Sequence, residues 1–437
     1  MTGRYKTYQE YADSQVDWIG RIPNHWGVKR LKFIFDIKKR IAGQLGFDVL
    51  SITQKGIIVK DIESGDGQLS MDYSKYQLVF NGDFAMNHMD LLTGYVDISD
   101  FNGVTSPDYR VFTIKDKTQF FDRYSLYLLQ MCYKQKIFFP LGQGSAHLGR
   151  WRLPTEAFNE VEYPHPDYLE QQKIANFLDH ETVKIDTLIT KQEKLIELLK
   201  EKRQAVISHA VTKGLNPDAP MKDSGVEWLG EVPEHWDVIF IKHLSQVKRG
   251  ASPRPIDDPK YFDDNGEYAW TRIADVSSSG MYLTETTQRL STLGSSLSVR
   301  LEAGELFLSI AGTVGKPCIT TSKACIHDGF VYFPQLRINN KYLYYIFDAG
   351  QAYLGLGKMG TQLNLNTDTV GGIKIGLPPA NEIEEIISNI EQKNTQYSDL
   401  ISKAVSSIDL MKERKTALIS AAVTGKIDVR DWQPQGV

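Results

Sequence analysis

The feature that most constrains this chain is an internal repeat. Residues 13–28 have the sequence DSQVDWIGRIPNHWGV, and a related segment, DSGVEWLGEVPEHWDV, occupies residues 223–238. Nine of the sixteen aligned positions are identical, including both tryptophans. A second matched pair joins residues 205–212 to residues 417–424, with a similar shift along the chain. Because a fixed repeat period reflects a repeated structural unit, the sequence predicts two tandem halves of one design.

Two long stretches have the hydrophobic spacing of helices. Apolar side chains recur every three, four or seven residues in both of them. In the first stretch these are Ile174, Leu178, Ile185, Leu188, Leu195, Leu199 and Val206. In the second they are Ile386, Ile390, Tyr397, Ile401, Ile408, Met411 and Leu418. This spacing is typical of the heptad repeat of a coiled coil. A helix of about 43 residues would be about 65 Å long, and it needs a partner to cover its apolar face.

We expect the two long helices to be each other's partner. They have the same length and the same heptad period, and the twofold relation between the repeats predicts that they run antiparallel. The alternative is that each helix is buried separately in its own domain, although buried helices average only about 12 residues.

The segments between the helices have the composition of mixed α/β domains. They are rich in aromatic and β-branched residues, and residues 50–52, 56–60, 109–114 and 306–310 have the character of strands. The expected fold class is α+β, a tandem pseudo-twofold repeat of two mixed α/β domains separated by two long helices packed as an antiparallel coiled coil. We expect domain 1 at 1–167, helix 1 at 168–213, domain 2 at 214–379, helix 2 at 380–426 and a tail at 427–437.

Composition restricts the class of protein and its partners. The 437 residues include 50 Lys and Arg against 54 Asp and Glu, a formal net charge of −4, so any contact with DNA must come from local patches. Cys132, Cys318 and Cys325 have no paired spacing, which argues against a disulfide framework and against a zinc site. No apolar run reaches the length of a membrane span. We therefore expect a soluble cytoplasmic protein.

Matching basic segments follow the repeated motif in both halves. In the first half the candidate DNA contacts are Lys38, Lys39 and Arg40. In the second half they are Lys248, Arg249, Ser252 and Arg254, within the sequence KRGASPRP. Glycine and proline favour an exposed loop there, and the arginine side chains have the fork of donors that binds phosphate or guanine. The alternative for either segment alone is a solvated charged surface.

Further polar loops supply the remaining candidate contacts to DNA. In the second half these are Arg272, Lys316, Gln362 and Asn364, of which the two amides could pair with adenine. In the first half they are Asn87, His88, Ser145, His147, Arg150 and Arg152. Hydrogen bonds within turns or packing in the core are the alternative for each single residue.

No catalytic motif is found in the sequence. Residues 355–360 match the pattern of a dinucleotide-binding glycine loop, but a polar, asparagine-containing stretch follows them instead of an opening helix. Pro166, Asp167, Glu170 and Lys173 have only a faint similarity to a metal nuclease, and acidic residues are common at the start of a helix. We therefore expect no catalytic residues and no metal in this chain.

Taken together, these segments resemble the specificity subunit of Type I restriction-modification enzymes. The resemblance is carried by residues 223–236, 248–255, 170–179 and 202–207 and extends over nearly the whole chain. It implies a non-catalytic subunit with two target-recognition domains, which bind double-stranded DNA at a split, asymmetric site. It also implies two methyltransferase subunits that use S-adenosylmethionine, and two restriction or translocase subunits that use ATP and magnesium. The alternatives are a coiled-coil scaffold that does not contact DNA, and a nuclease that acts alone.

Overall fold

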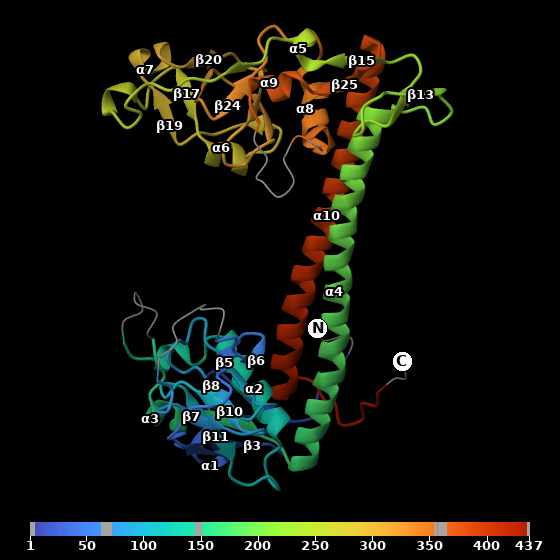
Figure 1. Cartoon of the computed structure of the whole chain (residues 1–437). Coiled ribbons are helices and arrows are strands. Elements are labelled where there is room, and N and C mark those ends of the chain that lie inside the picture. Colours follow the sequence, from blue (N-terminus) through green and yellow to red (C-terminus); the bar gives the residue numbers. More distant parts are fainter. Residues whose placement is uncertain (1–4, 63–71, 145–150, 354–355, 357–364, 435–437) are drawn as a thin grey trace. The chain divides into compact units, whose positions relative to one another are not determined.

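The computed structural model describes residues 5–62, 72–144, 151–353, 356 and 365–434. The chain forms two compact units, and each unit combines segments that are distant in the sequence. Unit 1 contains Met1–Gln192 and Ser406–Val437, and unit 2 contains Glu193–Val405. Each unit therefore holds one globular head, the first part of one long helix and the last part of the other (Figure 1).

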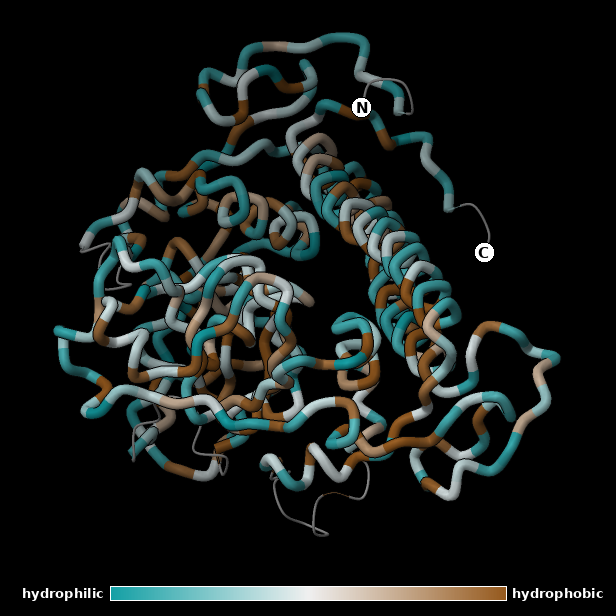
Figure 2. The backbone as a smooth tube through the Cα atoms, turned by 90° about the horizontal axis from the view of Figure 1, so that it is seen from above, coloured by the Kyte–Doolittle hydropathy of each residue, from teal (hydrophilic) through white to brown (hydrophobic). Residues whose placement is uncertain are grey.

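The two long helices are α4 (Tyr168–Lys213) and α10 (Ala380–Val423). In unit 1, Ile174 and Leu178 from the beginning of α4 share a hydrophobic cluster with Leu418 from the end of α10. In unit 2, Val211 from the end of α4 shares a cluster with Ile386 from the beginning of α10. The two helices are thus packed together and antiparallel, which confirms the expected fold. Figure 2 shows hydrophilic and hydrophobic residues mixed along the pair of long helices.

The predicted heptad positions are correct along α10 but wrong at two places in α4. Leu188 is 50% exposed and Leu195 is 42% exposed. Ile185 is buried, and Ile189, four residues further on, packs against the cluster of unit 1. A step of four residues after Ile185 stays on the apolar side of the helix, whereas the predicted step of three residues leaves it. The spacing of apolar residues allowed either step.

Unit 1 consists of short strands and helices around an aromatic core. Its strands are β1 (Tyr11–Asp13), β2 (Arg21–Pro23), β3 (Gly27–Arg30), β4 (Phe35–Lys38), β5 (Leu50–Thr53), β6 (Gly56–Val59), β7 (Gln77–Val79), β8 (Phe84–Met86), β9 (Val96–Ile98), β10 (Gly103–Thr105), β11 (Arg110–Ile114) and β12 (Glu162–His165). Its shorter helices are α1 (Leu31–Ile34), α2 (Asp122–Lys134), α3 (Thr155–Glu160) and the 3-10 turn η1 (Phe139–Leu141). The expected strands at 50–52, 56–60 and 109–114 correspond to β5, β6 and β11.

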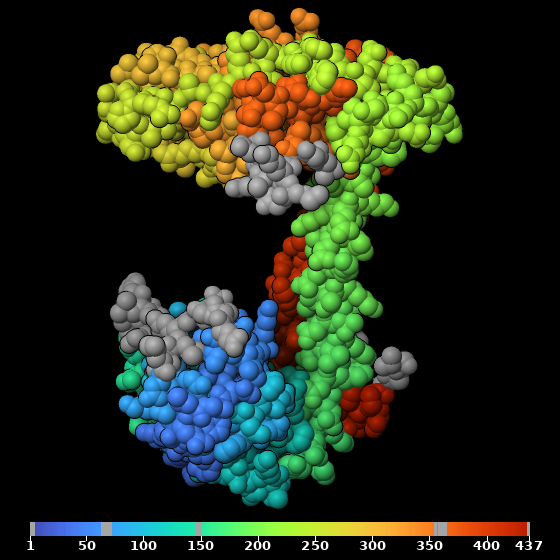
Figure 3. Space-filling view, viewed as in Figure 1, coloured from blue at the N-terminus to red at the C-terminus, as the bar shows by residue number. Residues whose placement is uncertain are grey.

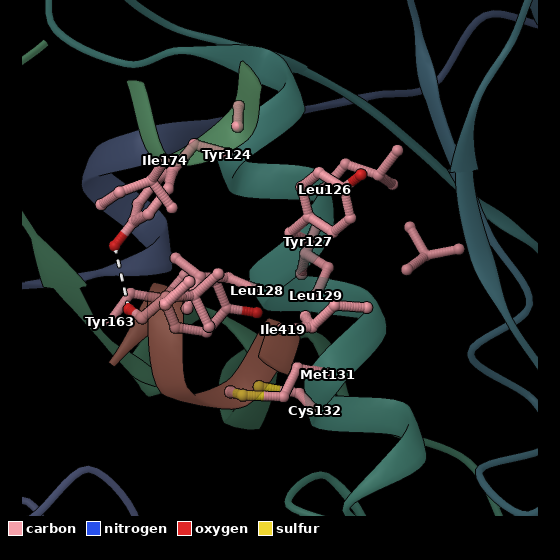
Figure 4. Packing of buried hydrophobic residues seen from close by; sticks show 14 of the residues in the cluster. Tyr124, Leu126, Tyr127, Leu128, Leu129, Met131, Cys132, Tyr163, Ile174 and Ile419 are labelled. Atoms are coloured by element: carbon pink, nitrogen blue, oxygen red, sulfur yellow. Dashed lines mark hydrogen bonds between the residues drawn. The ribbon is translucent and has the colours of Figure 1, made fainter. Parts of the chain in front are cut away.

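The central sheet of unit 1 has the strand order β4-β11-β8-β9, with antiparallel neighbours. Phe112 of β11 is fully buried, and its ring centroid lies 4.9 Å from that of Phe35 and 5.3 Å from that of Phe84. Such aromatic contacts contribute to stability beyond the area they bury. Behind this sheet α2 packs between the head and the long helices, and its side chains contact Tyr163, Ile174 and Ile419 (Figure 4).

Unit 2 has a larger set of strands in two main sheets. Its strands are β13 (Met221–Asp223), β14 (Glu231–Pro233), β15 (Asp237–Phe240), β16 (Lys248–Arg249), β17 (Tyr268–Thr271), β18 (Tyr282–Leu283), β19 (Gln288–Leu290), β20 (Val299–Leu301), β21 (Leu306–Ser309), β22 (Pro317–Thr320), β23 (Ala324–Ile326), β24 (Phe330–Tyr332) and β25 (Lys374–Leu377). One sheet has the order β16-β24-β21-β22-β18 and the other β19-β17-β23-β20. The expected strand at 306–310 corresponds to β21.

Unit 2 also contains short helices, and two of its strand pairs repeat the layout of unit 1. The helices are α5 (Ile241–Leu244), α6 (Ile273–Ser278), α7 (Thr292–Ser296), α8 (Asn340–Asp348) and α9 (Thr367–Gly371), with 3-10 turns η3 (Pro259–Tyr261) and η4 (Gln351–Tyr353). The strand pairs β1–β2 and β3–β12 of unit 1 have the counterparts β13–β14 and β15–β25 in unit 2. The repeated sequence motif therefore forms the same local structure twice.

The repeated motif is also anchored in the same way in both units. His25 Nε2 lies 2.9 Å from Glu170 at the start of α4, and His235 Nε2 lies 2.7 Å from Glu382 at the start of α10. The Tyr124 hydroxyl lies 3.1 Å from the carbonyl oxygens of both Pro164 and Val423. In unit 2 the Tyr342 hydroxyl lies 3.0 Å from the Gly376 oxygen and 3.5 Å from the Val211 oxygen. In each half the motif histidine thus contacts the start of the long helix of the same half, while a tyrosine of the head contacts the end of the other long helix.

The environments of the two glutamates nevertheless differ. Glu170 also accepts a hydrogen bond from the Tyr8 hydroxyl at 2.7 Å, and Arg430 Nε lies 4.0 Å away. Burial, together with the bond to Glu170, raises the pKa of Tyr8 well above its usual range. Glu382 instead accepts a hydrogen bond from Trp236 Nε1 at 3.0 Å. Unit 1 therefore fixes its glutamate with residues from both ends of the chain.

The three cysteines, Cys132, Cys318 and Cys325, are free and buried. Burial raises the pKa of the Cys132 thiol to about 12, so this side chain packs as a small neutral group. None of the helices in the described part of the chain is long and apolar enough to cross a membrane.

Candidate nucleic-acid interface

The basic loop of unit 2 is built around Asp328, in the turn between β23 and β24. Arg254 Nη2 lies 3.2 Å from Asp328 Oδ2, and the Ser252 hydroxyl donates to Asp328 Oδ1 at 3.2 Å. Arg249 Nε donates to the backbone oxygen of the same residue. Lys248 and Arg249 form the short strand β16, which pairs with β24, and both side chains are exposed. The structure thus brings Arg249, Ser252 and Arg254 together at one turn.

Arg272 immediately precedes α6, at a second exposed position of the same head. Its guanidinium donates a hydrogen bond to the side chain of Gln288 on β19. Its backbone N–H donates to the Asp275 carboxylate at 2.8 Å, which caps the first turn of the helix. This cap leaves the Arg272 side chain exposed on the surface.

Lys316 lies at the other end of α6 and already has partners within the protein. Its Nζ donates to the backbone oxygens of Ser277 and Ser279, both at 2.8 Å. A lysine in this place satisfies carbonyl groups that the end of a helix leaves without partners. The Ser277 and Thr313 hydroxyls, 2.6 Å apart, connect α6 to the same loop. A contact between Lys316 and DNA would compete with these bonds.

In unit 1 the candidate residues Lys38, Lys39 and Arg40 lie at and just beyond the end of β4. Lys38 pairs with Asp36, and Lys39 is exposed. Arg40 is more enclosed, because its guanidinium lies 2.9 Å from Asp83 and 4.8 Å from the centre of the Phe80 ring. Lys39 is therefore the candidate of this segment that is most open to a phosphate group.

Asn87 and His88 follow β8, and the structure places Arg152 close to them. The backbone N–H of Leu153 donates to the His88 oxygen at 2.8 Å, and the Leu91 N–H donates to the Trp151 oxygen at 3.0 Å. Arg152 is exposed. His88 is largely enclosed, and burial, aided by the nearby charge of Arg110, lowers its pKa to about 3. His88 is therefore a neutral ring at physiological pH, which can exchange hydrogen bonds but carries no charge for a phosphate.

The other candidates, Ser145, His147, Arg150, Gln362 and Asn364, lie outside the residues that the structure describes. In the described residues no group of three or more His, Cys, Asp or Glu side chains could hold a metal ion.

Sequence reasoning missed two residues that contact these segments. Asp328 is an acidic residue far along the sequence from the basic loop, so a search for clusters of positive charge does not find it. Arg110 is only 4% exposed, and its Nη2 donates to the Leu153 oxygen at 3.0 Å, close to Arg152. Burial lowers the pKa of Arg110 to about 10. The sequence places Arg110 within a strand but contains no signal of these contacts.

The long helices present a different kind of surface. Several large apolar side chains on them are exposed: Leu169, Val183, Leu188 and Leu410 in unit 1, and Leu195, Leu198, Leu400 and Val405 in unit 2. Figure 3 shows α4, in green, with one side uncovered. Exposed apolar side chains of this size are candidates for contact with another protein.

Comparison with known proteins identifies the family. The model of the Type I restriction modification DNA specificity domain matches this chain twice, at residues 23–198 and 233–418. The chain belongs to this family. Its two DNA specificity domains include the loops described above and most of α4 and α10. The protein is therefore a DNA-recognition subunit, as the resemblance implied, and the scaffold and nuclease alternatives are not favoured.

Individual relatives agree with the family match. The MjaX specificity subunit of Methanocaldococcus jannaschii is 23% identical, with 94% of this chain and 96% of the relative covered. The type I restriction enzyme MjaVIII specificity subunit of the same organism is also 23% identical, with 94% and 95% covered. The similarity thus extends over nearly the whole length of this chain and of both relatives.

Solved structures share the fold. A chain from a study of complex assembly and conformational transition of the type I R-M system has a TM-score of 0.69 at 15% identity, with 92% of this chain and 98% of that chain covered. The HsdS subunit from Thermoanaerobacter tengcongensis has a TM-score of 0.55 at 15% identity, with 93% and 98% covered.

Proposed function

We propose that this protein recognises a split DNA site with two unlike halves, each half contacted by one DNA specificity domain. The observation that carries the proposal is the double family match, at residues 23–198 and 233–418, combined with the difference between the two sets of exposed loops. The loops of unit 1 carry exposed Lys39 and Arg152 and half-buried Asn87, whereas unit 2 presents Arg249 and Arg254 around an acidic residue. Two surfaces with different donors and acceptors favour two different base sequences.

The contacts to DNA divide into two classes by the surroundings of each side chain. Lys39 and Lys248 are exposed lysines, which bind phosphate as point charges and position the protein without reading sequence. Arg254 and Arg272 have planar guanidinium groups, and in each of them one nitrogen is already held by a protein oxygen. Arginines held in this way are suited to contact the edges of bases.

The proposed partners are two modification subunits, and two restriction or translocase subunits where the complex also cleaves DNA. The exposed apolar side chains of α4 and α10 support this proposal, because a bound partner would cover them. The methyl donor S-adenosylmethionine, together with ATP and magnesium, would be bound by these partners. In this proposal the chain works in the cytoplasm and carries no catalytic residue, and its contribution to the reaction is the choice of site.

A genome-wide map of N6-methyladenine tests the proposal. The map of the source cells is compared with that of cells in which this one gene is deleted. We expect methylation to disappear at a single two-part motif whose halves differ, and to return when the gene is restored. Unchanged methylation in a strain that expresses the modification partner would contradict the proposal. A symmetric motif would contradict the assignment of unlike halves to the two domains.

A further inference from the structure

Asp328 is an acidic residue in the middle of the basic loop of unit 2. Three of the residues predicted to contact DNA donate hydrogen bonds to it. Arg249 donates to its backbone oxygen, Ser252 to Oδ1 and Arg254 to Oδ2. A carboxylate close to DNA opposes the negative phosphates, so its presence at such a surface needs an explanation.

The loop around Asp328 is fixed by its backbone. The N–H of Gly250 donates to the Phe330 oxygen at 2.9 Å, and the N–H of Ala251 donates to the Ile326 oxygen at 3.1 Å. A Cβ atom at Gly250 would lie 2.1 Å from the backbone oxygen of His327, so this close approach requires glycine. The segment that carries Arg249 and Arg254 is therefore held against the turn that carries Asp328.

The ion pair between Arg254 and Asp328 is too exposed to serve folding. The Arg254 side chain is 80% exposed and that of Asp328 is 43% exposed. Ion pairs in such positions contribute little to the stability of a protein, because water screens them. The pair does restrict the orientation of the guanidinium, since Nη2 is directed at Oδ2 while the rest of the group faces solvent.

We propose that Asp328 is a positioning residue that holds the guanidinium of Arg254 for a bidentate contact with guanine in the major groove. The inference rests on the proposed function, because it requires that unit 2 contacts DNA. Arginine pairs with O6 and N7 of guanine through two parallel N–H groups, so a fixed plane favours this base over the others. The carboxylate also opposes the phosphates of every DNA sequence, and only the correct site offsets this cost through the contact of guanine with Arg254.

The two effects of Asp328 lead to opposite changes in the variant Asp328→Asn. Its binding to DNA of unrelated sequence should rise about two- to fivefold, because one negative charge is removed. Its discrimination between sequences should fall, because Arg254 is no longer held. Damage to the fold would instead lower both quantities.

The experiment uses the full chain and a pool of DNA duplexes with a randomised central region. Bound duplexes are recovered and sequenced, and total affinity is measured with the unselected pool. We expect the wild type to select a two-part motif. With Asp328→Asn the guanine preference should be lost in one half of that motif, while the other half, selected by unit 1, stays unchanged. Equal discrimination by the variant and the wild type would overturn the inference.

Three further variants sharpen the test. Asp264→Asn removes the same charge from an exposed loop of the same unit and should leave the motif intact. Arg254→Lys keeps the charge but loses the fork of donors, so it should lose the same guanine position even if Asp328→Asn does not fold. Full discrimination by Arg254→Lys would overturn the inference independently.

A double variant separates positioning from direct contact. Combining Asp328→Asn with Arg254→Ala should cause no loss of discrimination beyond that of Arg254→Ala alone. Losses at different positions that add together would show that Asp328 contacts a base itself, and would overturn the inference. If the wild type selects no motif at all, the proposed function fails. If the wild type selects its motif and Asp328→Asn selects the same one, only the inference about Asp328 fails.

Discussion

At the scale of single residues, two tyrosines show how the repeat is stabilised. Tyr124 and Tyr342 are both buried. The Tyr342 hydroxyl lies 3.0 Å from the Gly376 oxygen and 3.5 Å from the Val211 oxygen, and Tyr124 makes the corresponding contacts with Pro164 and Val423. Each hydroxyl therefore joins a strand of its head to the end of a long helix.

Replacing either tyrosine by phenylalanine removes this link while keeping the ring. We expect Tyr124→Phe and Tyr342→Phe each to lower the free energy of unfolding by about 1–2 kcal/mol, because buried carbonyl groups lose a donor. Urea denaturation of the full chain measures the effect. Tyr397→Phe is the matched control, since the described residues contain no hydrogen-bond partner for this hydroxyl on α10. Equal stability of the control and the two test variants would contradict the assignment.

At the scale of elements, the ends of the long helices are set by glycines. Gly214 follows α4 with φ 74°, and Gly425 follows α10 with φ 71°. Both residues adopt the left-handed conformation that commonly ends a helix. Lys213, just before Gly214, donates hydrogen bonds from Nζ to the backbone oxygens of Leu229 and Glu231. Lys426, just after Gly425, donates in the same way to the backbone oxygens of Ile19 and Arg21 in unit 1.

The contacts of these glycines predict unequal effects of alanine. A Cβ atom at Gly425 would lie 2.4 Å from Pro23 Cδ, whereas at Gly214 its nearest neighbour, Glu382 Oε1, would be 3.1 Å away. Both variants pay the left-handed cost of about 1–2 kcal/mol, and Gly425→Ala should lose more because of the additional clash. Thermal unfolding measures the order. Gly280→Ala, where a Cβ atom would meet nothing within 4 Å, should be nearly neutral. The reverse order would show that Pro23 moves aside freely.

At the scale of the whole molecule, DNA must be bound by a protein whose formal net charge is −4. Attraction to phosphate then depends on local basic residues, and the affinity should fall steeply as salt is added. For Lys248→Ala we expect the slope of log K against log salt to become less negative by about 0.9, the value of one phosphate contact. Lys412→Ala makes the same change of charge at an exposed position on α10 and should keep the slope. A titration with duplex DNA checks both, and an unchanged slope for Lys248→Ala would exclude Lys248 as a phosphate contact.

The architecture of this protein was predictable from its sequence. The repeated motif and the two stretches with heptad spacing predicted the tandem design and the antiparallel helices, because periodic apolar residues must be buried together whatever the details of the fold. Local composition was also sufficient for strands such as β5, β6 and β11, whose residues favour extended backbone.

Which side chains meet depends on how distant segments pack together. Leu188 and Leu195 match the heptad spacing but are exposed, because the choice between a step of three and a step of four depends on the partner helix. Lys316 is bonded to the end of α6, and Arg40 pairs with Asp83, although both belong to basic or polar segments in the sequence. Asp328 lies 74 residues from Arg254 along the chain, and only the pairing of β16 with β24 brings its turn to the basic loop. Such contacts depend on pairing between distant segments, which the local pattern of a sequence does not encode.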